Sequence, residues 1–527
     1  MLTWKEHEKH YRIESHYGDR TVMCLAERPR SLFAMLAKAA SGNPQGDALA
    51  CGDFRCDWRE LLDLVETVAG GLHGLGVAGG DRVVLFLGNR AEFVIALFAI
   101  ARIGAVAVPV GTREQAPGLA YIVEQSGACA IIHESELAAL VPPGPATISV
   151  GAGSPLDFVA GLKRANAPLP EIAADEEAPA LIMYTSGTTG RPKGAIVTGL
   201  ALVHAGAAYT ACMELSRVDR SVCFVPLSHI TGITATICAM TFCRGCMIIA
   251  PSFRAEDFTG LAVRERMTHS LMVPAMYNLL LARGEMDGEK LSNWRIGGFG
   301  GAPMPVPSIE ALATRLPGLH LMNCYGATET CGGVTVLPSS ELTHNSDSVG
   351  WPVPGAIVTV VNENGVAVGH GEVGEILIGG PQISPGYWRN ADATEANFRD
   401  GFWKSGDLGT IDARGLFRVV DRLKDMINRG GYKIYSAEVE GVLAGHPAVL
   451  EAAVVGVPCE ILGQRVEAFI ALREDAVAEP AELTAFCRAR LTDYKVPERF
   501  HIGVAPLPRN PNGKILKRML EPDRAIT

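Results

Sequence analysis

The sequence lacks the charge balance of a nucleic-acid-binding protein. Its 47 lysine and arginine residues are outnumbered by 57 aspartate and glutamate residues, which gives a formal net charge of −10. Because nucleic-acid backbones attract basic surfaces, this balance argues against a nucleic-acid partner.

Long apolar runs are also missing. The longest apolar stretches, Phe93–Ala101 and Ile230–Cys243, end at Arg102 and Arg244, short of the about 20 residues that a membrane-spanning helix needs. The first residues, Met1–His10, are charged and lack the apolar core of a secretory signal. We therefore expect a soluble, cytoplasmic protein with no transmembrane segment.

The 13 cysteines are scattered along the chain. An odd number scattered over a long chain fits reduced thiols better than a disulfide framework. Cys243 and Cys246 form a lone CxxC, and a zinc site would need a second pair or nearby histidines. We interpret both as buried apolar thiols.

Strands and helices alternate in the first part of the chain. Apolar strands over 82–87, 105–110 and 128–132 are separated by helical segments over 92–102 and 119–125. This βα repeat predicts a parallel sheet covered by helices. Further strand candidates follow at Cys246–Ala250, Ser270–Val273, Trp294–Phe299 and Leu319–Asn323.

The pattern changes twice towards the C-terminus. From about Ser348, short β segments are separated by glycine and asparagine, and after Asp421 the charge density rises. We predict an α/β protein with a large multi-layer N-terminal domain, 1–421, that contains parallel sheets and a β-rich subdomain. A small α+β C-terminal domain, 422–527, follows it.

The segment Tyr184–Gly194 is rich in hydroxyl side chains and glycine and lies between the apolar runs Ala180–Met183 and Ala195–Val197. Two strands holding a loop of amides, hydroxyls and the Lys193 ammonium suit a polyphosphate. A Walker A loop would place Gly-Lys before Ser or Thr at a helix start, whereas Lys193 here precedes a strand-like run. The segment predicts a phosphate loop of another kind rather than a flexible linker.

Other segments that follow strands carry side chains that could bind a metal ion or a nucleotide. Glu329 offers a carboxylate for Mg²⁺, Asp407 lies in a glycine turn suited to ribose hydroxyls, and Lys514 lies in a Pro/Gly-rich loop. His229 ends a strand where open α/β sheets place ligands, although alone it is more often a core or surface histidine.

In this order, the motifs resemble the AMP-forming acyl-adenylate superfamily, which includes acyl-CoA synthetases, aryl-CoA ligases, peptide-synthetase adenylation domains and luciferases. The resemblance extends from about residue 30 to about residue 520. It implies an enzyme that couples a carboxylic acid to ATP with Mg²⁺, releases pyrophosphate, and transfers the acyl group from AMP to a thiol, which is that of coenzyme A in the CoA ligases.

The resemblance also assigns roles in the first half-reaction. The phosphate loop comprises Thr185, Ser186, Gly187, Thr188, Thr189, Gly190 and Lys193. Segments around adenine comprise Gly301, Ala302, Pro303, Asn323, Cys324, Tyr325 and Gly326. Glu329 with Thr328 matches the Mg²⁺ site, Asp407 and Arg422 match ribose contacts, and Val419 joins the nucleotide site. The implied catalytic residues are Lys514, Glu329, Thr185 and His229.

In the second half-reaction the C-terminal domain is expected to be mobile and to rotate at Lys424. The rotation would bring Gly430, Gly431 and Tyr432 to the pantetheine channel. The resemblance places the acid against His229, Ile230, Thr231, Gly232, Ile233, Gly326 and Ala327.

The expected acid pocket is uncharged. No aspartate or glutamate occurs between Asp219 and Glu256, where peptide-synthetase domains usually hold an amino acid's ammonium. This favours an aromatic or an unbranched fatty acid. A stand-alone adenylating enzyme that loads a carrier protein and a carnitine-type acid–CoA ligase, suggested by Arg429-Gly430-Gly431, remain alternatives. A homodimer also stays open.

Overall fold

The computed structural model describes residues 4–173, 175–185, 191–509 and 515–520. The chain divides into two compact units. The first unit comprises residues 1–358 and 377–404, and the second comprises 359–376 and 405–527. The divisions fall within strands β18 (Ile357–Val361), β19 (Gly374–Gly379) and β21 (Phe402–Ile411). The predicted domains 1–421 and 422–527 stay a prediction.

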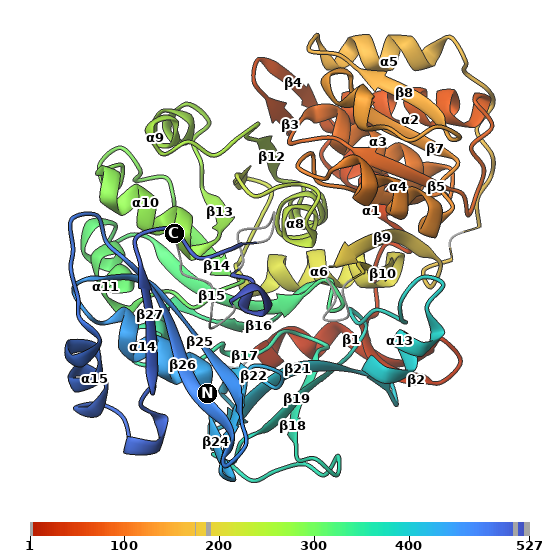
Figure 1. The fold of residues 1–527 in the computed structure, drawn as a ribbon. Coiled ribbons are helices and arrows are strands. Elements are labelled where there is room, and N and C mark those ends of the chain that lie inside the picture. The colour runs from red at the N-terminus through yellow and green to blue at the C-terminus, as the bar shows by residue number, and fades with distance from the viewer. Residues whose placement is uncertain (1–3, 174, 186–190, 510–514, 521–527) are drawn as a thin grey trace. The chain divides into compact units, whose positions relative to one another are not determined.

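The first unit contains a six-stranded sheet among its described residues, in the order β10-β9-β6-β5-β7-β8. Its strands are β5 (Arg82–Phe86), β6 (Val106–Pro109), β7 (Ala130–Glu134), β8 (Ala146–Val150), β9 (Pro179–Thr185) and β10 (Lys193–Thr198). All neighbouring strands are parallel except β9 and β10. The predicted βα repeat of parallel strands is therefore confirmed (Figure 1).

A second sheet of the first unit has nine strands among the described residues, in the order β17-β16-β15-β14-β13-β11-β12-β3-β4. They are β3 (Asp47–Cys51), β4 (Phe54–Asp57), β11 (Arg220–Cys223), β12 (Cys246–Ile249), β13 (His269–Met272), β14 (Ile296–Gly300), β15 (His320–Ala327), β16 (Gly332–Leu337) and β17 (Trp351–Pro352). Neighbouring strands in the run β15-β14-β13-β11-β12 are parallel, whereas β15 and β16 form an antiparallel hairpin.

Helices cover these sheets. They are α1 (Leu32–Gly42), α2 (Trp58–Gly74), α3 (Ala91–Arg102), α4 (Ala116–Ser126), α5 (Pro155–Lys163), α6 (Gly199–Cys212), α7 (Ile230–Gly232), α8 (Ala239–Cys243), α9 (Ala255–Arg264), α10 (Pro274–Arg283), α11 (Val306–Arg315), α12 (Ser339–Leu342) and α13 (Ala391–Asn397). Helices α3 and α6 are buried on almost every side, as their uninterrupted apolar sequences require. They form the centre of the main hydrophobic core.

Shorter elements complete the first unit. A hairpin of β1 (Tyr11–His16) and β2 (Arg20–Leu25) follows a 3-10 helix over Trp4–His10. A further 3-10 helix covers Ser135–Leu140, a π-helix covers Ile233–Cys238, and β20 (Phe398–Arg399) pairs with the start of β21.

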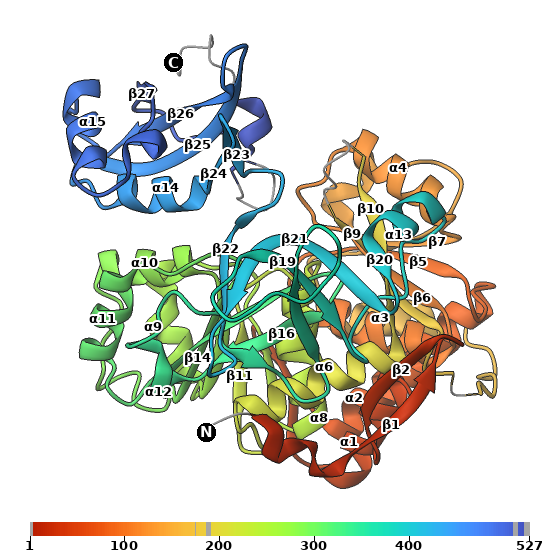
Figure 2. The same ribbon diagram turned by 90° about the horizontal axis from the view of Figure 1, so that it is seen from below.

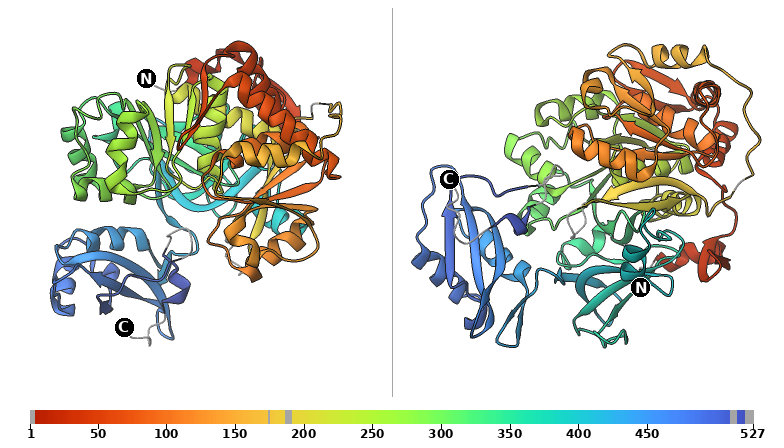
Figure 3. Two further views of the ribbon diagram at one scale, coloured as in Figure 1. Left: turned by 90° about the horizontal axis from the view of Figure 1, so that it is seen from above. Right: turned by 45° about the vertical axis from the view of Figure 1, so that its right-hand side comes forward.

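The second unit has its own core. Strands β23 (Ile427–Arg429), β24 (Tyr432–Ile434), β25 (Val449–Cys459), β26 (Gly463–Leu472) and β27 (Arg499–Gly503) form one sheet. Helices α14 (Ser436–Ala444) and α15 (Pro480–Arg488) contribute to its hydrophobic core. Strand β22 (Phe417–Arg422) pairs with β21, and 3-10 helices cover Asp493–Lys495 and Lys517–Met519. Figures 2 and 3 show the sheet of β23–β27 with α14 and α15 in blue.

The structure agrees with the predicted cysteine chemistry and α/β class. All thirteen cysteines, which lie within the described ranges, are free. Cys246 is buried as predicted, whereas Cys243 is only partly buried. Among the described residues, no helix is both long and apolar enough to cross a membrane.

Candidate active site

The predicted phosphate loop joins two adjacent strands. Strands β9 and β10 are antiparallel, with Thr185 opposite Lys193 and Tyr184 opposite Gly194. The two flanking apolar runs are therefore strands, as predicted. The loop residues Ser186, Gly187, Thr188, Thr189 and Gly190 lie outside the described residues.

The base of this loop is anchored by side chains from α4. The Tyr121 hydroxyl donates to the Pro192 carbonyl at 3.1 Å, and the Tyr184 hydroxyl donates to the side-chain oxygen of Gln125. The Gln125 amide in turn donates to the carbonyl of Trp388 at 2.8 Å. These bonds fix the strand ends from which the loop projects.

Glu329 lies in the turn between β15 and β16, and Thr330 holds this turn together. The Thr330 hydroxyl accepts a hydrogen bond from the Ala327 amide at 2.8 Å and lies 2.7 Å from the Gly332 carbonyl. Cys331 and Gly332 both have positive φ, +53° and +104°. The turn therefore has a defined shape that presents Glu329 in one direction.

The Glu329 carboxylate is buried, with 8% exposure, and accepts a hydrogen bond from the Tyr387 hydroxyl at 2.9 Å. Burial raises the pKa of Glu329, while its own backbone amide, Tyr387, the Lys193 ammonium and the Thr185 hydroxyl oppose the shift. The structure thus brings together three residues that the sequence assigned to one site: Thr185, Lys193 and Glu329.

This group of side chains suits a magnesium ion. Its potential ligands are oxygen atoms, from the Glu329 carboxylate and from hydroxyls such as that of Thr185, with Thr328 in the same turn. Mg²⁺ prefers oxygen ligands and is commonly bound by one or two carboxylates together with substrate phosphates. The donor set therefore fits the ion that the sequence predicted for Glu329.

His229 lies directly before α7, which continues into the π-helix, and its side chain makes no capping hydrogen bond. Asn89, which sequence reasoning missed, fixes the preceding turn. Its side-chain oxygen accepts from the Leu227 amide at 2.7 Å, and its amide donates to the Val225 carbonyl at 2.9 Å. Burial lowers the pKa of His229, which favours a neutral ring near pH 7. The only sequence feature that could have identified Asn89 is its position in Gly88-Asn89-Arg90, directly after a predicted strand.

The predicted acid-binding segment contains Ile230, Thr231 and Gly232 in α7, with Ile233 starting the π-helix. Irregular helices of this kind are frequent at functional sites. Nearby, the Gly333 amide donates to the hydroxyl of the buried Tyr209 at 3.0 Å. Sequence reasoning did not find Tyr209, which lies on the apolar helix α6.

Glycines allow strands β15 and β16 to lie close together here. Gly326 and Gly333 are partners across the hairpin. A Cβ atom on Gly326 would lie 1.8 Å from the Gly332 carbonyl oxygen, so this position excludes a side chain. Ala327, also assigned to the acid, ends β15 and leads into the Glu329 turn.

The residues expected around adenine have mixed environments. Gly301, with a φ of +79°, Ala302 and Pro303 are exposed directly after β14. By contrast, the Asn323 amide donates to the Ser348 carbonyl at 2.9 Å, and Cys324 is buried in the hydrophobic core. Tyr325 lies within β15, which continues beyond the end that the sequence predicted. Adenine binding by these segments stays a prediction.

In the second unit, Asp407 and Arg422 lie opposite each other on β21 and β22. The Arg422 Nε atom lies 3.2 Å from Asp407 Oδ1, with the aspartate side chain 9% exposed and the arginine side chain 45% exposed. Val419 lies on β22 opposite Gly409. The predicted ribose pair is therefore an ion pair on neighbouring strands.

Lys424 is exposed in the turn after β22, and Gly430 and Gly431 connect β23 to β24. Both glycines have positive φ, +59° and +92°, as a two-residue type I′ hairpin turn requires. Tyr432 is 59% exposed, and its ring stacks on Tyr494 with centroids 4.6 Å apart. Lys514 lies outside the described residues.

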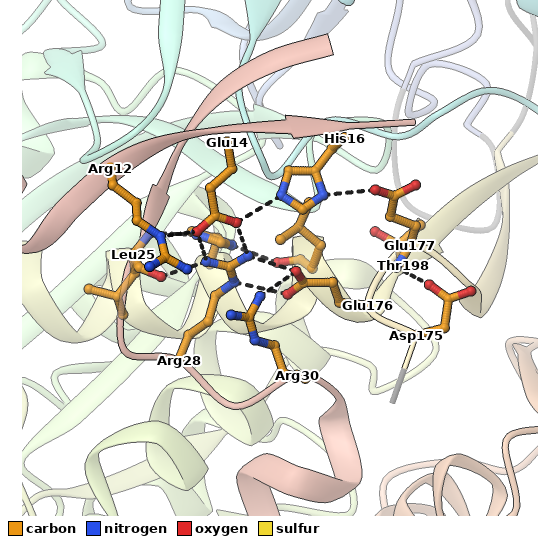
Figure 4. A network of polar contacts seen from close by, with 12 residues as sticks. Arg12, Glu14, His16, Leu25, Arg28, Arg30, Asp175, Glu176, Glu177 and Thr198 are labelled. Atoms are coloured by element: carbon orange, nitrogen blue, oxygen red, sulfur yellow. Dashed lines mark hydrogen bonds and ion pairs between the residues drawn. The ribbon is translucent and has the colours of Figure 1, made fainter. Parts of the chain in front are cut away.

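A separate polar cluster on the first unit resembles a metal site only in composition. Potential ligand atoms of Glu14, His16 and Cys24 lie within 4.8 Å of one another. However, the Arg28 guanidinium donates to both carboxylate oxygens of Glu14, and burial raises the pKa of Cys24 to about 12. Figure 4 shows Arg28 between Glu14 and Glu176, so the cluster ties the β1–β2 hairpin to the segment before β9.

Comparisons with known proteins agree with this geometry. Residues 36–388 match the AMP-binding enzyme family, and residues 438–514 match the AMP-binding enzyme C-terminal domain. The chain is 34% identical to the long-chain-fatty-acid–CoA ligase FadD13 of Mycobacterium tuberculosis, over 94% of this chain and 98% of the relative. It is 35% identical to a feruloyl-CoA synthase from an Amycolatopsis species, over 93% and 98% of the two chains.

Among solved structures, the chain is similar to the o-succinylbenzoate–CoA synthetase MenE of Bacillus subtilis in complex with its acyl-adenylate intermediate. The TM-score is 0.85 at 30% identity, over 95% of this chain and 99% of MenE. These matches confirm the predicted fold and the predicted superfamily, and the relatives' activities agree with the predicted acid–thiol ligase class. The chain belongs to the family of AMP-binding enzymes.

Proposed function

We propose that this protein is an AMP-forming acid–CoA ligase that activates an aromatic or fatty acid with ATP and then transfers the acyl group to coenzyme A. The observation that carries this proposal is that Glu329 and Lys193 both contact Tyr387 at the base of the loop between β9 and β10, where Thr185 lies opposite Lys193. A carboxylate, a hydroxyl and an ammonium at one place are the groups that hold a polyphosphate and its cation.

In the first step, a carboxylate oxygen of the acid attacks the α-phosphorus of ATP, and pyrophosphate leaves. Both reactants are anionic, so positioning and charge neutralisation dominate the catalysis. Lys193 and Thr185 would hold the departing phosphates, and Glu329 would hold Mg²⁺, which would supply neutralising charge. Asp407 and Arg422 hold the ribose, and Lys514 stabilises charge on the α-phosphate and the acid.

In the second step, the thiolate sulfur of coenzyme A attacks the acyl carbonyl carbon, and AMP leaves with the electron pair of the broken acyl–phosphate bond. Rotation at Lys424 of a C-terminal domain, 422–527, withdraws Lys514 and brings the Gly430–Tyr432 turn to the pantetheine. This assignment follows from the resemblance of the chain to its superfamily.

The uncharged character of the His229–Ile233 segment supports an acid with an apolar body. A charged tail buried there would lack a partner. FadD13 is named for a fatty acid and the feruloyl-CoA synthase for an aromatic one, so both classes stay in the proposal. The carnitine-type acid–CoA ligase stays an alternative, although the glycine pair that suggested it also forms a type I′ turn.

The test is mass spectrometry of products formed from ATP, Mg²⁺, coenzyme A and single acids, comparing aromatic acids with straight-chain acids of increasing length. We expect an acyl-CoA and AMP with one of these classes. An acyl-adenylate that persists in the presence of coenzyme A, but is consumed by a phosphopantetheinylated carrier protein, would instead establish the carrier-loading alternative.

A further inference from the structure

Tyr387, a residue that no motif singled out, contacts the carboxylate expected to bind magnesium. Its hydroxyl donates to Glu329 Oε1 at 2.9 Å, and its side chain is 7% exposed. Three residues earlier, the Ser384 amide donates to the Glu329 carbonyl at 2.8 Å. This backbone bond and the phenol bond both lie within the first unit. One short segment therefore holds Glu329 by its backbone and by its side chain.

The segment that carries Tyr387 is itself fixed. The Ile196 amide of β10 donates to the Gly386 carbonyl at 3.0 Å, and the Tyr387 amide donates to the Thr394 hydroxyl at 2.9 Å. The largely buried Arg20 of β2 donates to the Ser384 carbonyl at 3.1 Å. Because these hydrogen bonds fix the backbone on both sides of the Tyr387 side chain, the phenol has little freedom to move away from the Glu329 carboxylate.

The same ring also lies near the phosphate loop. The Lys193 Nζ atom is 5.3 Å from the centroid of the Tyr387 ring, within the range of a cation–π contact. Tyr387 thus touches both the expected metal ligand and the expected phosphate ligand.

We propose that Tyr387 is a positioning residue for this site: its hydroxyl holds Glu329 Oε1 and so fixes the orientation of the carboxylate that would bind Mg²⁺ beside the nucleotide phosphates. This inference rests on the proposed function. A carboxylate that binds a metal is commonly oriented by a second hydrogen bond, and loss of such a bond typically weakens metal binding by about 10- to 100-fold.

The test substitutes Tyr387→Phe, which keeps the ring beside Lys193 and removes only the hydroxyl. Mn²⁺ serves as the probe, with its binding followed by electron paramagnetic resonance in the presence of a non-cleavable ATP analogue. We expect the apparent Mn²⁺ affinity to fall by about 10- to 100-fold, while binding of the metal-free analogue changes little.

Tyr277→Phe is the matched control. Tyr277 is also buried, and its hydroxyl donates to a backbone carbonyl, that of Gly298, at 2.9 Å. Both variants lose one buried hydrogen bond, but only Tyr387→Phe should change metal affinity. Equal changes in the two variants would mean that Tyr387 has a structural role alone, which overturns the inference.

A second variant, Arg20→Met, removes the guanidinium that anchors the Ser384 carbonyl and keeps Tyr387 itself. It should weaken Mn²⁺ binding in the same direction by a smaller factor, and it decides the matter if Tyr387→Phe does not fold. If Tyr387→Phe and Arg20→Met both fold and both bind Mn²⁺ as tightly as the wild type, this inference is overturned but the proposed function is not. A wild-type protein that binds no metal–nucleotide complex overturns the proposed function and this inference together.

Discussion

Glu329 and Asp407 are both buried carboxylates assigned to the nucleotide, yet their surroundings differ. Glu329 is held by the neutral phenol of Tyr387, and burial raises its pKa. Asp407 instead forms an ion pair with Arg422 in the second unit. A buried carboxylate without an arginine partner gains most from an incoming cation, whereas a carboxylate that is already paired suits neutral hydroxyls. The partners of each carboxylate thus agree with the ligand proposed for it.

The largest expected effect comes from Glu329→Gln, which keeps the shape of the side chain and removes its charge. Loss of a metal ligand worth several kcal/mol should lower acid-dependent pyrophosphate release by about 100-fold or more. The measurement is a rate at saturating ATP over a series of Mg²⁺ concentrations. A variant as fast as the wild type would remove Glu329 from the metal site.

A smaller effect is expected from Asp407→Asn, which weakens the acceptor for the ribose. Hydrogen bonds to charged groups contribute about 1.5–3 kcal/mol, so the KM for ATP should rise by about 10- to 100-fold. An ATP analogue lacking both ribose hydroxyls provides the control, because wild type and variant should have similar KM values for it. If the variant is impaired with this analogue as strongly as with ATP, Asp407 acts elsewhere.

Lys424→Pro tests the proposed hinge and should alter only the second step. Proline restricts φ and the residue before it, so acyl-adenylate should form near the wild-type rate while thioester formation slows by about tenfold, the effect of roughly 1.4 kcal/mol. Quenched-flow separation of the two products measures both steps. A normal rate of thioester formation would contradict the hinge assignment.

The last prediction concerns stability rather than activity and tests how burial sets protonation in the first unit. Burial lowers the pKa of His204 to about 4 from an ordinary value of 6.5, and its ring accepts a hydrogen bond from the Leu25 amide at 3.0 Å. A lowered folded-state pKa makes the neutral ring's contribution present above pH 6.5 and lost as the pH falls towards 4.

Wild type should therefore lose about 3 kcal/mol more unfolding free energy than His204→Gln between neutral pH and pH 4. Urea unfolding at a series of pH values measures this difference. Parallel pH dependence of the two proteins would show that His204 titrates normally in the folded state.

Local sequence patterns were sufficient to predict the strands on both sides of the Tyr184–Gly194 loop and the position of Glu329 after a strand. The loop is recognisable because its hydroxyls and glycines cannot form a core, and its flanking runs can only be strands. Asp407 was predicted from its glycine turn and Arg422 from the resemblance to the superfamily, and the register of β21 and β22 then places them in contact.

The residues that support the site could not be predicted in this way. Tyr387 lies 58 positions from Glu329, and Asn89 lies 136 positions from Val225. Their roles arise from contacts between strands and loops that are distant in the sequence, and a lone tyrosine or asparagine carries no local pattern. Thr330 was closer, but its role depends on the positive φ of Cys331, an uncommon conformation for a residue other than glycine.

The most direct test of the central claim is isotope exchange between radiolabelled pyrophosphate and ATP, measured without coenzyme A. Exchange requires reversible formation of an acyl-adenylate at the Thr185–Lys193–Glu329 site. The account predicts exchange that depends on both an aromatic or fatty acid and Mg²⁺, and that is lost in Glu329→Gln. Exchange that needs no acid, or that persists in Glu329→Gln, would contradict it.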